Sequence, residues 1–114
     1  MKRTKAPRIY LRLSRDHPIV FKTLDKLGAA VRSAGPLDER TGHLVQLAAA
    51  AAMRSEGAVH SHVRRALAAG ASAEEVEHAL LLLISTIGMP QVVAALSWAR
   101  DVSGAAPKKR RKRA

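Results

Sequence analysis

The sequence predicts an all-α fold, a bundle of about five to six helices, from its composition and its periodicity. Ala, the residue with the highest helix propensity, supplies 22 of the 114 residues. Between residues 16 and 104, apolar side chains recur at spacings of three and four, which is the period of one helix face, and capping or stop residues separate these stretches. A chain of this length forms one domain.

The formal net charge of +11 divides the chain into three parts. Residues 1–15 form a basic N-terminal segment with six cations and no acid, and residues 105–114 form a basic C-terminal tail. The domain between them, residues 16–104, has eight basic and nine acidic side chains. The tail cations are Lys108, Lys109, Arg110, Arg111, Lys112 and Arg113. We expect both termini to be disordered and their charge to serve solubility or the binding of a polyanion.

Cysteine is absent from the chain, which excludes a disulfide framework, a thiolate metal site and a thiol nucleophile. The basic start has no apolar segment that resembles a secretory signal, so we expect a cytoplasmic protein. An Ala-rich core buries little apolar area per residue. We therefore expect association into a homo-oligomer.

The first expected helix begins near Asp16, read as an N-cap, with Pro18 in the first turn. It ends at Gly35-Pro36. Its apolar stripe consists of Val20, Leu24, Leu27 and Val31.

The second expected helix begins after the N-cap Asp38 and runs to about Met53. Its buried face is predicted to hold Leu44, Leu47, Ala48 and Ala51. His43 lies one turn before Leu47 and so points toward the same side.

The third expected helix begins at Ser55, a predicted cap, and ends at Gly70. Its stripe holds Val59, His62, Val63, Ala66 and Leu67. His62 therefore faces inward, whereas His60, about 200° away around the helix, should point elsewhere.

Ser72 and Glu75 form a capping box at the start of the next helix. The 21 residues from 79 to 99 carry no charge, a length that raises a membrane-spanning alternative. Gly88-Met89-Pro90 interrupts them, and lipid would leave the backbone groups of such a break unpaired. We therefore expect two buried helices joined by a tight turn, the first with the stripe Val76, Leu80, Leu83 and Ile87 and the second with Val92, Leu96 and Ala99.

The stretch HVRRALAAGASAEEVEHALLL, the Gly-Met-Pro turn after it and the Ala-rich last helix together resemble the carboxymuconolactone decarboxylase / alkylhydroperoxidase D-like family. The resemblance covers residues 37–98, more than half of the chain. It implies an alkylhydroperoxidase D-like helical bundle that assembles as a trimer, a hexamer or a related ring.

In the peroxidase branch of that family, a Glu, a Cys-x-x-Cys pair and a His converge on one site. The resemblance puts His43 at the Glu position, Ser55 and Ala58 at the Cys positions and His62 at the His position. A methyl group at Ala58 cannot act as a nucleophile. Ser55 lies about 10 Å from His62 along a regular helix, too far for a hydrogen bond. We expect no thiol peroxidase activity, and helix capping is the simplest role for Ser55.

The decarboxylase branch also lacks the Cys pair and acts on a lactone acid. If this chain is an enzyme, the resemblance implies a lyase rather than a peroxidase, with His62, His43 and Ser55 as catalytic candidates. The candidate ligand-binding residues are Glu56, Arg54 and Arg64. The other interpretation of His62 is a hydrogen-bonded core residue without a chemical role.

A metal site is a further interpretation of the same histidines. His43 and His62 are its predicted centre, with Glu56 or His60 as additional ligands. A His-x-His pair on a helix sends its rings to different faces, whereas a spacing of four residues aligns them. We therefore expect no metal and no other cofactor.

Two functions remain open at this level. The first is a carboxymuconolactone-decarboxylase-like homo-oligomer that binds or transforms a small anionic ligand at a pocket formed by His43 and His62. The alternative is a non-catalytic oligomer whose basic tails bind nucleic acid without sequence preference, because the domain has no basic recognition helix and few aromatic side chains.

Overall fold

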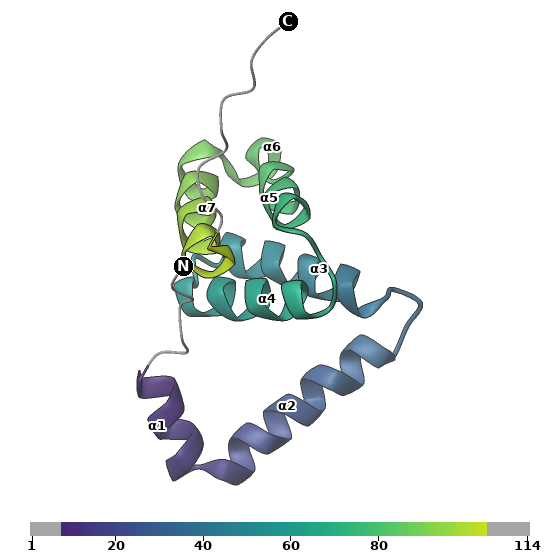
Figure 1. Ribbon diagram of the computed structural model, residues 1–114, viewed down its shortest axis with the longest axis vertical. Coiled ribbons are helices and arrows are strands. Elements are labelled where there is room, and N and C mark those ends of the chain that lie inside the picture. Colours follow the sequence, from purple (N-terminus) through teal and green to yellow (C-terminus); the bar gives the residue numbers. More distant parts are fainter. Residues whose placement is uncertain (1–7, 105–114) are drawn as a thin grey trace, which may run out of the picture.

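The computed structural model describes residues 8–104, which form seven helices and no strand (Figure 1). The helices are α1 (Arg8–Asp16), α2 (Pro18–Ser33), α3 (Glu39–Ala52), α4 (Glu56–Ala68), α5 (Ala73–Leu81), α6 (Ile84–Ile87) and α7 (Met89–Ser103). The all-α prediction is confirmed. None of these helices is both long enough and apolar enough to span a membrane.

The core lies where α3, α4, α5 and α7 meet. α3 and α4 lie side by side, and α5 and α7 pack across them (Figure 1). The largest fully buried side chains are Leu47, Leu80, His43, Val59, Val63, Val76 and Val92. Small buried residues such as Ala50, Ala66 and Ala95 allow the helix backbones to approach closely, at the cost of little buried area per residue.

Three predicted caps begin three of the core helices. The Asp38 carboxylate accepts a hydrogen bond from the Thr41 amide at 2.8 Å, and the Ser55 hydroxyl accepts one from the Ala58 amide at 3.3 Å. Ser72 and Glu75 form both hydrogen bonds of the capping box. Each cap satisfies amides that have no partner within the helix.

The uncharged segment folds as helices separated by Gly88, as predicted, with an added break. The prediction that these helices are buried is wrong for one side of them, because Leu81, Leu82, Met89 and Val93 are exposed. Gly88 adopts a φ of 96°, a backbone conformation that residues other than Gly rarely adopt. Pro90 follows in the first turn of α7. The first helix was predicted to continue to Ile87, but α5 ends at Leu81 and a single turn, α6, follows. Leu83 and Ile87 are consequently only partly buried.

The N-terminal part differs from the prediction. No helix was expected before Asp16, but α1 occupies residues 8–16, and Asp16 ends α1 instead of capping α2. His17 is the residue before α2 and makes no side-chain cap. Tyr10 on α1 packs edge-on against Phe21 on α2, with ring centroids 5.2 Å apart, which gives α1 a partner. Residues 1–7 and the predicted disordered tail 105–114, with its six cations, lie outside the described residues.

The predicted apolar stripe of α2 exists but is not buried. Val20, Leu24, Leu27 and Val31 are each more than half exposed. α1 and α2 form an arm that extends away from the core, and α2 contacts the bundle mainly through α3 (Figure 1). One chain alone therefore leaves the apolar face of α2 largely uncovered.

Candidate functional site

His43 on α3 and His62 on α4 face each other where these two helices pack. Their ring centroids lie 5.8 Å apart, with the ring planes tilted by 40°. His43 is 2% exposed and His62 is partly buried. The Nδ1 atom of each ring is buried without a hydrogen-bond partner. The two histidines singled out in the sequence thus lie together, as expected.

His60 points in a different direction from His62, as predicted, because it faces Asp101 of α7 while His62 faces His43 of α3, but His60 is buried there too. His60 is 7% exposed and more buried than His62. α4 packs against α3 on one side and α7 on the other, so both of these sides are covered. The single-stripe pattern expected for α4 does not describe a helix enclosed on two sides.

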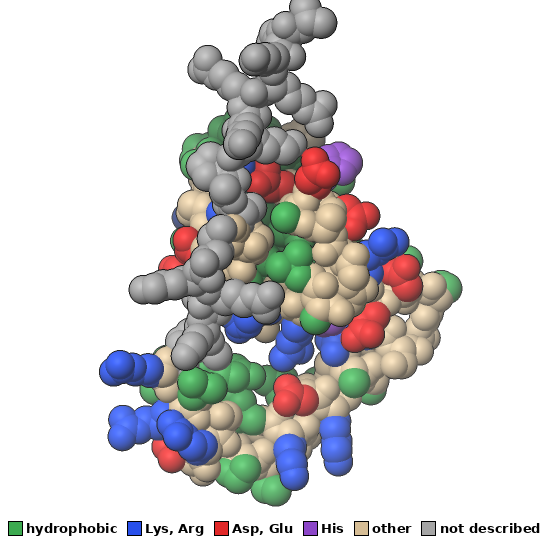
Figure 2. Space-filling model, viewed as in Figure 1, with side chains coloured by type: hydrophobic (Ala, Val, Ile, Leu, Met, Phe, Trp, Pro, Cys, Tyr) green, Lys and Arg blue, Asp and Glu red, His purple; other side chains and the backbone are tan. Residues whose placement is uncertain are grey.

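A cavity of about 610 Å³ separates the α1–α2 arm from α4. Figure 2 shows its opening as a hollow between the arm and the bundle, with Lys and Arg side chains along the bundle side. Tyr10, Leu24, Leu27 and Val31 line it from the arm. The polar lining consists of Arg32, Gln46, Ser61, His62, Arg64 and Arg65. A smaller cavity of about 320 Å³ on the far side of Arg32 and Arg65 contains His43, Asp25 and Glu39.

Three arginines make the larger cavity cationic. Arg32 crosses from α2 to α3 and packs over Gly42, where an added Cβ would lie 3.6 Å from the Arg32 Cγ atom, an ordinary van der Waals contact. Arg65 approaches the Asp25 carboxylate of α2 at 3.8 Å. Arg64 has a buried Nη1 atom without a hydrogen-bond partner. A buried guanidinium nitrogen without a hydrogen-bond partner is energetically unfavourable unless a ligand or a water molecule accepts a hydrogen bond from it.

Both histidines are electrically neutral near pH 7. Burial lowers the pKa of His62 to about 4, and His43, Arg65 and Arg32 contribute to the same shift. Burial also lowers the pKa of His43, with Arg32 and Arg65 acting in the same direction, while Glu39, 3.8 Å from its Nε2, opposes them. Neutral imidazoles beside cationic side chains can accept a proton from an acid bound there or hydrogen-bond to it.

The other predicted site residues lie elsewhere. Ser55 caps α4, and Glu56 approaches His60 at 3.9 Å on the α7 side of α4. Arg54, in a left-handed conformation with φ of 58°, donates a hydrogen bond to Gln91 Oε1 at 3.4 Å. None of these three lines either cavity described above. Arg64 does line the larger one.

Sequence reasoning missed Arg32 and Arg65. Arg65 follows His62 by three residues, so the spacing alone places both on neighbouring positions of one helix surface. Arg32 reaches the histidines only because α2 folds back over α3. No local pattern indicates that contact.

The fold and the cavity define an all-α protein with a cationic pocket that contains a histidine. The sequence model of the carboxymuconolactone decarboxylase family matches residues 18–101, so the chain belongs to this family. It is similar to an uncharacterized protein of Methanocaldococcus jannaschii, with 29% identity over 87 residues that cover 76% of this chain and 81% of that protein. No solved structure matches.

Proposed function

We propose that this protein is a carboxymuconolactone-decarboxylase-like homo-oligomer that binds a small carboxylate in the cavity between α2 and α4 and has no thiol peroxidase activity. The observation that carries the proposal is the set of three arginines, Arg32, Arg64 and Arg65, around the neutral His62. Guanidinium groups bind carboxylates through paired hydrogen bonds. The apolar wall of α2 suits the hydrocarbon or ring portion of such a ligand.

If the bound acid is transformed, the reaction class is that of a lyase. Loss of carbon dioxide from an acid leaves negative charge on the remaining carbon skeleton, and the arginines stabilise that charge. His62 lines the cavity and is neutral, so it is the side chain that can accept a proton from the bound molecule, and the His43 ring lies 5.8 Å from it. Ser55 has no part in this proposal because it caps α4 and does not line the cavity.

A second copy of the chain is the proposed cover for the exposed apolar face of α2. That face borders the cavity through Leu24, Leu27 and Val31, so an assembled neighbour also encloses the ligand. Contiguous apolar surface on one helix is typical of a surface that another protein covers. Assembly and ligand enclosure are thus linked in this proposal.

The proposal is tested by titrating the protein with cis,cis-muconate, a small dicarboxylate, in a calorimeter. We expect Arg32→Gln and Arg65→Gln each to weaken binding by about tenfold or more, since a hydrogen bond to a charged group contributes about 1.5–3 kcal/mol. Arg40→Gln is the matched control, because Arg40 pairs with Glu75 at 3.8 Å and does not line the cavity. Equal affinity in all four proteins would reject the arginine pocket.

The second candidate function is non-specific nucleic-acid binding by the basic termini. Six consecutive cations in the tail support it. Binding to an arbitrary duplex is expected to weaken by about 10³ or more between ~50 and ~200 mM salt, and to disappear when residues 1–8 and 105–114 are deleted. Binding that survives this deletion at ~200 mM salt would show that the termini are not responsible.

A further inference from the structure

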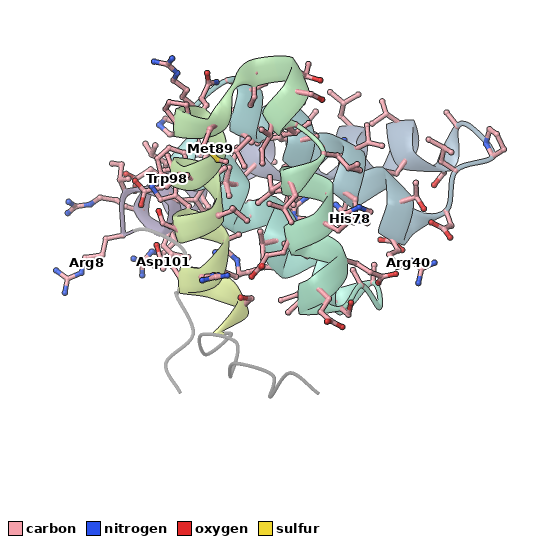
Figure 3. The ribbon with its side chains drawn as sticks, turned by 90° about the horizontal axis from the view of Figure 1, so that it is seen from above. Arg8, Arg40, His78, Met89, Trp98 and Asp101 are labelled. Atoms are coloured by element: carbon pink, nitrogen blue, oxygen red, sulfur yellow. The ribbon has the colours of Figure 1, made fainter. Side chains whose placement is uncertain are left out.

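A second cluster of ionisable side chains lies on the α7 side of α4, away from the cavity. It joins His60 and Glu56 of α4 to Asp101. Asp101 lies near the carboxyl end of α7 (Figure 3). One potential ligand atom from each of the three residues lies within 4.8 Å of the others. His60 and His62 are two positions apart on the helix, so their rings leave it in directions about 200° apart.

The His60 ring is directed at the two carboxylates without forming a hydrogen bond to either. Its Nε2 atom lies 3.4 Å from Asp101 Oδ2 and 3.9 Å from Glu56 Oε2. This nitrogen is buried and has no hydrogen-bond partner, and the residue is 7% exposed. A buried nitrogen lone pair or N–H without a partner is unfavourable, so something else is expected to satisfy it.

Two of the three separations between these atoms are close to those in the coordination shell of a metal ion, and the third, between the Glu56 and Asp101 oxygens, is within 4.8 Å. Around an ion bound at about 2.1 Å by nitrogen and oxygen, two tetrahedral ligands lie about 3.4 Å apart. The His60–Asp101 distance already has this value, and the His60–Glu56 distance requires a movement of about half an ångström by an exposed, flexible Glu. Both carboxylates are more than half exposed, so an ion has a path from solvent.

We propose that Glu56, His60 and Asp101 bind a divalent transition-metal ion of the zinc class. One imidazole nitrogen and two carboxylate oxygens are suitable ligands for Zn²⁺, and three protein ligands leave a fourth position for water. The ion also crosslinks α4 to α7, two helices of the core. This site shares no residue with the proposed carboxylate pocket, so the test of metal binding does not depend on whether that pocket binds a carboxylate.

The test is a titration of untagged, chelator-treated protein with Zn²⁺, read by competition with a zinc-binding dye. We expect one ion per chain, and we expect Glu56→Gln and Asp101→Asn each to weaken binding by at least the ~10–100-fold that loss of a supporting group around a metal typically costs. Both residues are exposed, so these variants keep the fold even if His60→Gln does not. Co²⁺ absorption in the visible range gives a second readout of coordination by the same residues.

The chain supplies a matched control in Glu39 and His43. These residues have the same spacing of four and a similar separation of 3.8 Å, but no second carboxylate is grouped with them among the described residues. Glu39→Gln is therefore expected to bind Zn²⁺ as the unchanged protein does. Absence of binding at micromolar Zn²⁺, or equal affinity in the Glu56→Gln and Asp101→Asn variants, would overturn the proposal.

Discussion

The ring centroids of His62 and His43 lie 5.8 Å apart. His62 lines the cationic cavity, whereas His43 is buried in the core. Neither Nδ1 atom has a hydrogen-bond partner. The pair combines two properties that core histidines seldom have together, neutrality and unsatisfied nitrogen atoms beside arginines. The pH dependence of stability and the NMR titration described below depend on that combination.

Stability is expected to fall as the pH is lowered from about 6.5 to about 4. The pKa of His62 is about 4 in the folded protein, against 6.5 for an unperturbed histidine. In this window the unfolded chain binds a proton at His62 that the folded chain does not, so the free energy of unfolding decreases with decreasing pH. Above pH 6.5, His62 no longer contributes to the pH dependence of the free energy of unfolding. Urea unfolding across this range measures the slope.

The matched comparison uses His62→Gln and His78→Gln. His78 is exposed and lines neither cavity, so its replacement is the control for the loss of a histidine. We expect a shallower decline for His62→Gln. An identical decline in both variants would contradict the lowered pKa of His62 in the folded protein.

Ser55→Ala is expected to destabilise the protein by about 1 kcal/mol, the usual cost of losing a helix N-cap. Carboxylate binding should not change, because Ser55 bonds the Ala58 amide and does not line the cavity. Chemical denaturation and the muconate titration measure these two effects. A loss of affinity without a loss of stability would show that Ser55 contributes to carboxylate binding.

The protein is expected to have a mass in solution several-fold above the 12.2 kDa of one chain. Val20→Asp places a charge on the exposed apolar face of α2, and we expect it to shift the assembly toward smaller species. Lys22→Asp adds an acid about 200° away on the same helix, and we expect this variant to leave the assembly unchanged. Light scattering that finds a stable monomer for the unchanged protein would exclude the homo-oligomer.

Peroxide reduction is expected to be absent. The sequence resemblance puts Ser55 and Ala58 where the peroxidase branch has its cysteines. The chain has no Cys, and without thiols no disulfide can form to carry the electrons. An assay with an organic hydroperoxide and a dithiol reductant checks this. Turnover above that of a heat-denatured control would show that the assignment of those positions is wrong.

Local signals in the sequence predicted the starts of three core helices, but the cap expected at Asp16 was wrong and α1 was not expected. The caps at Asp38, Ser55 and Ser72 depend on a side chain and an amide three residues later, so neighbouring residues determine them. The turn at Gly88 follows from the conformation that only Gly adopts readily. The pairing of His43 with His62 was expected from the family resemblance.

Features that depend on tertiary packing were not predicted. Arg32 belongs to the site because α2 folds back over Gly42 of α3, and no spacing in the sequence indicates this contact. The burial of His60 requires knowing that α7 covers the second side of α4. The exposed stripe of α2 shows the same limit, because its periodicity predicts an apolar face but not whether the same chain covers it.

The central claim, that an anion binds beside His62, is tested most directly by NMR titration of the histidine ring nitrogens with and without muconate. In the free protein the pKa of His62 should be about 4. A bound carboxylate places negative charge near the ring and offsets the effect of the arginines, so saturation with muconate should raise the pKa of His62. An unchanged pKa of His62 at saturating muconate would contradict the proposed site.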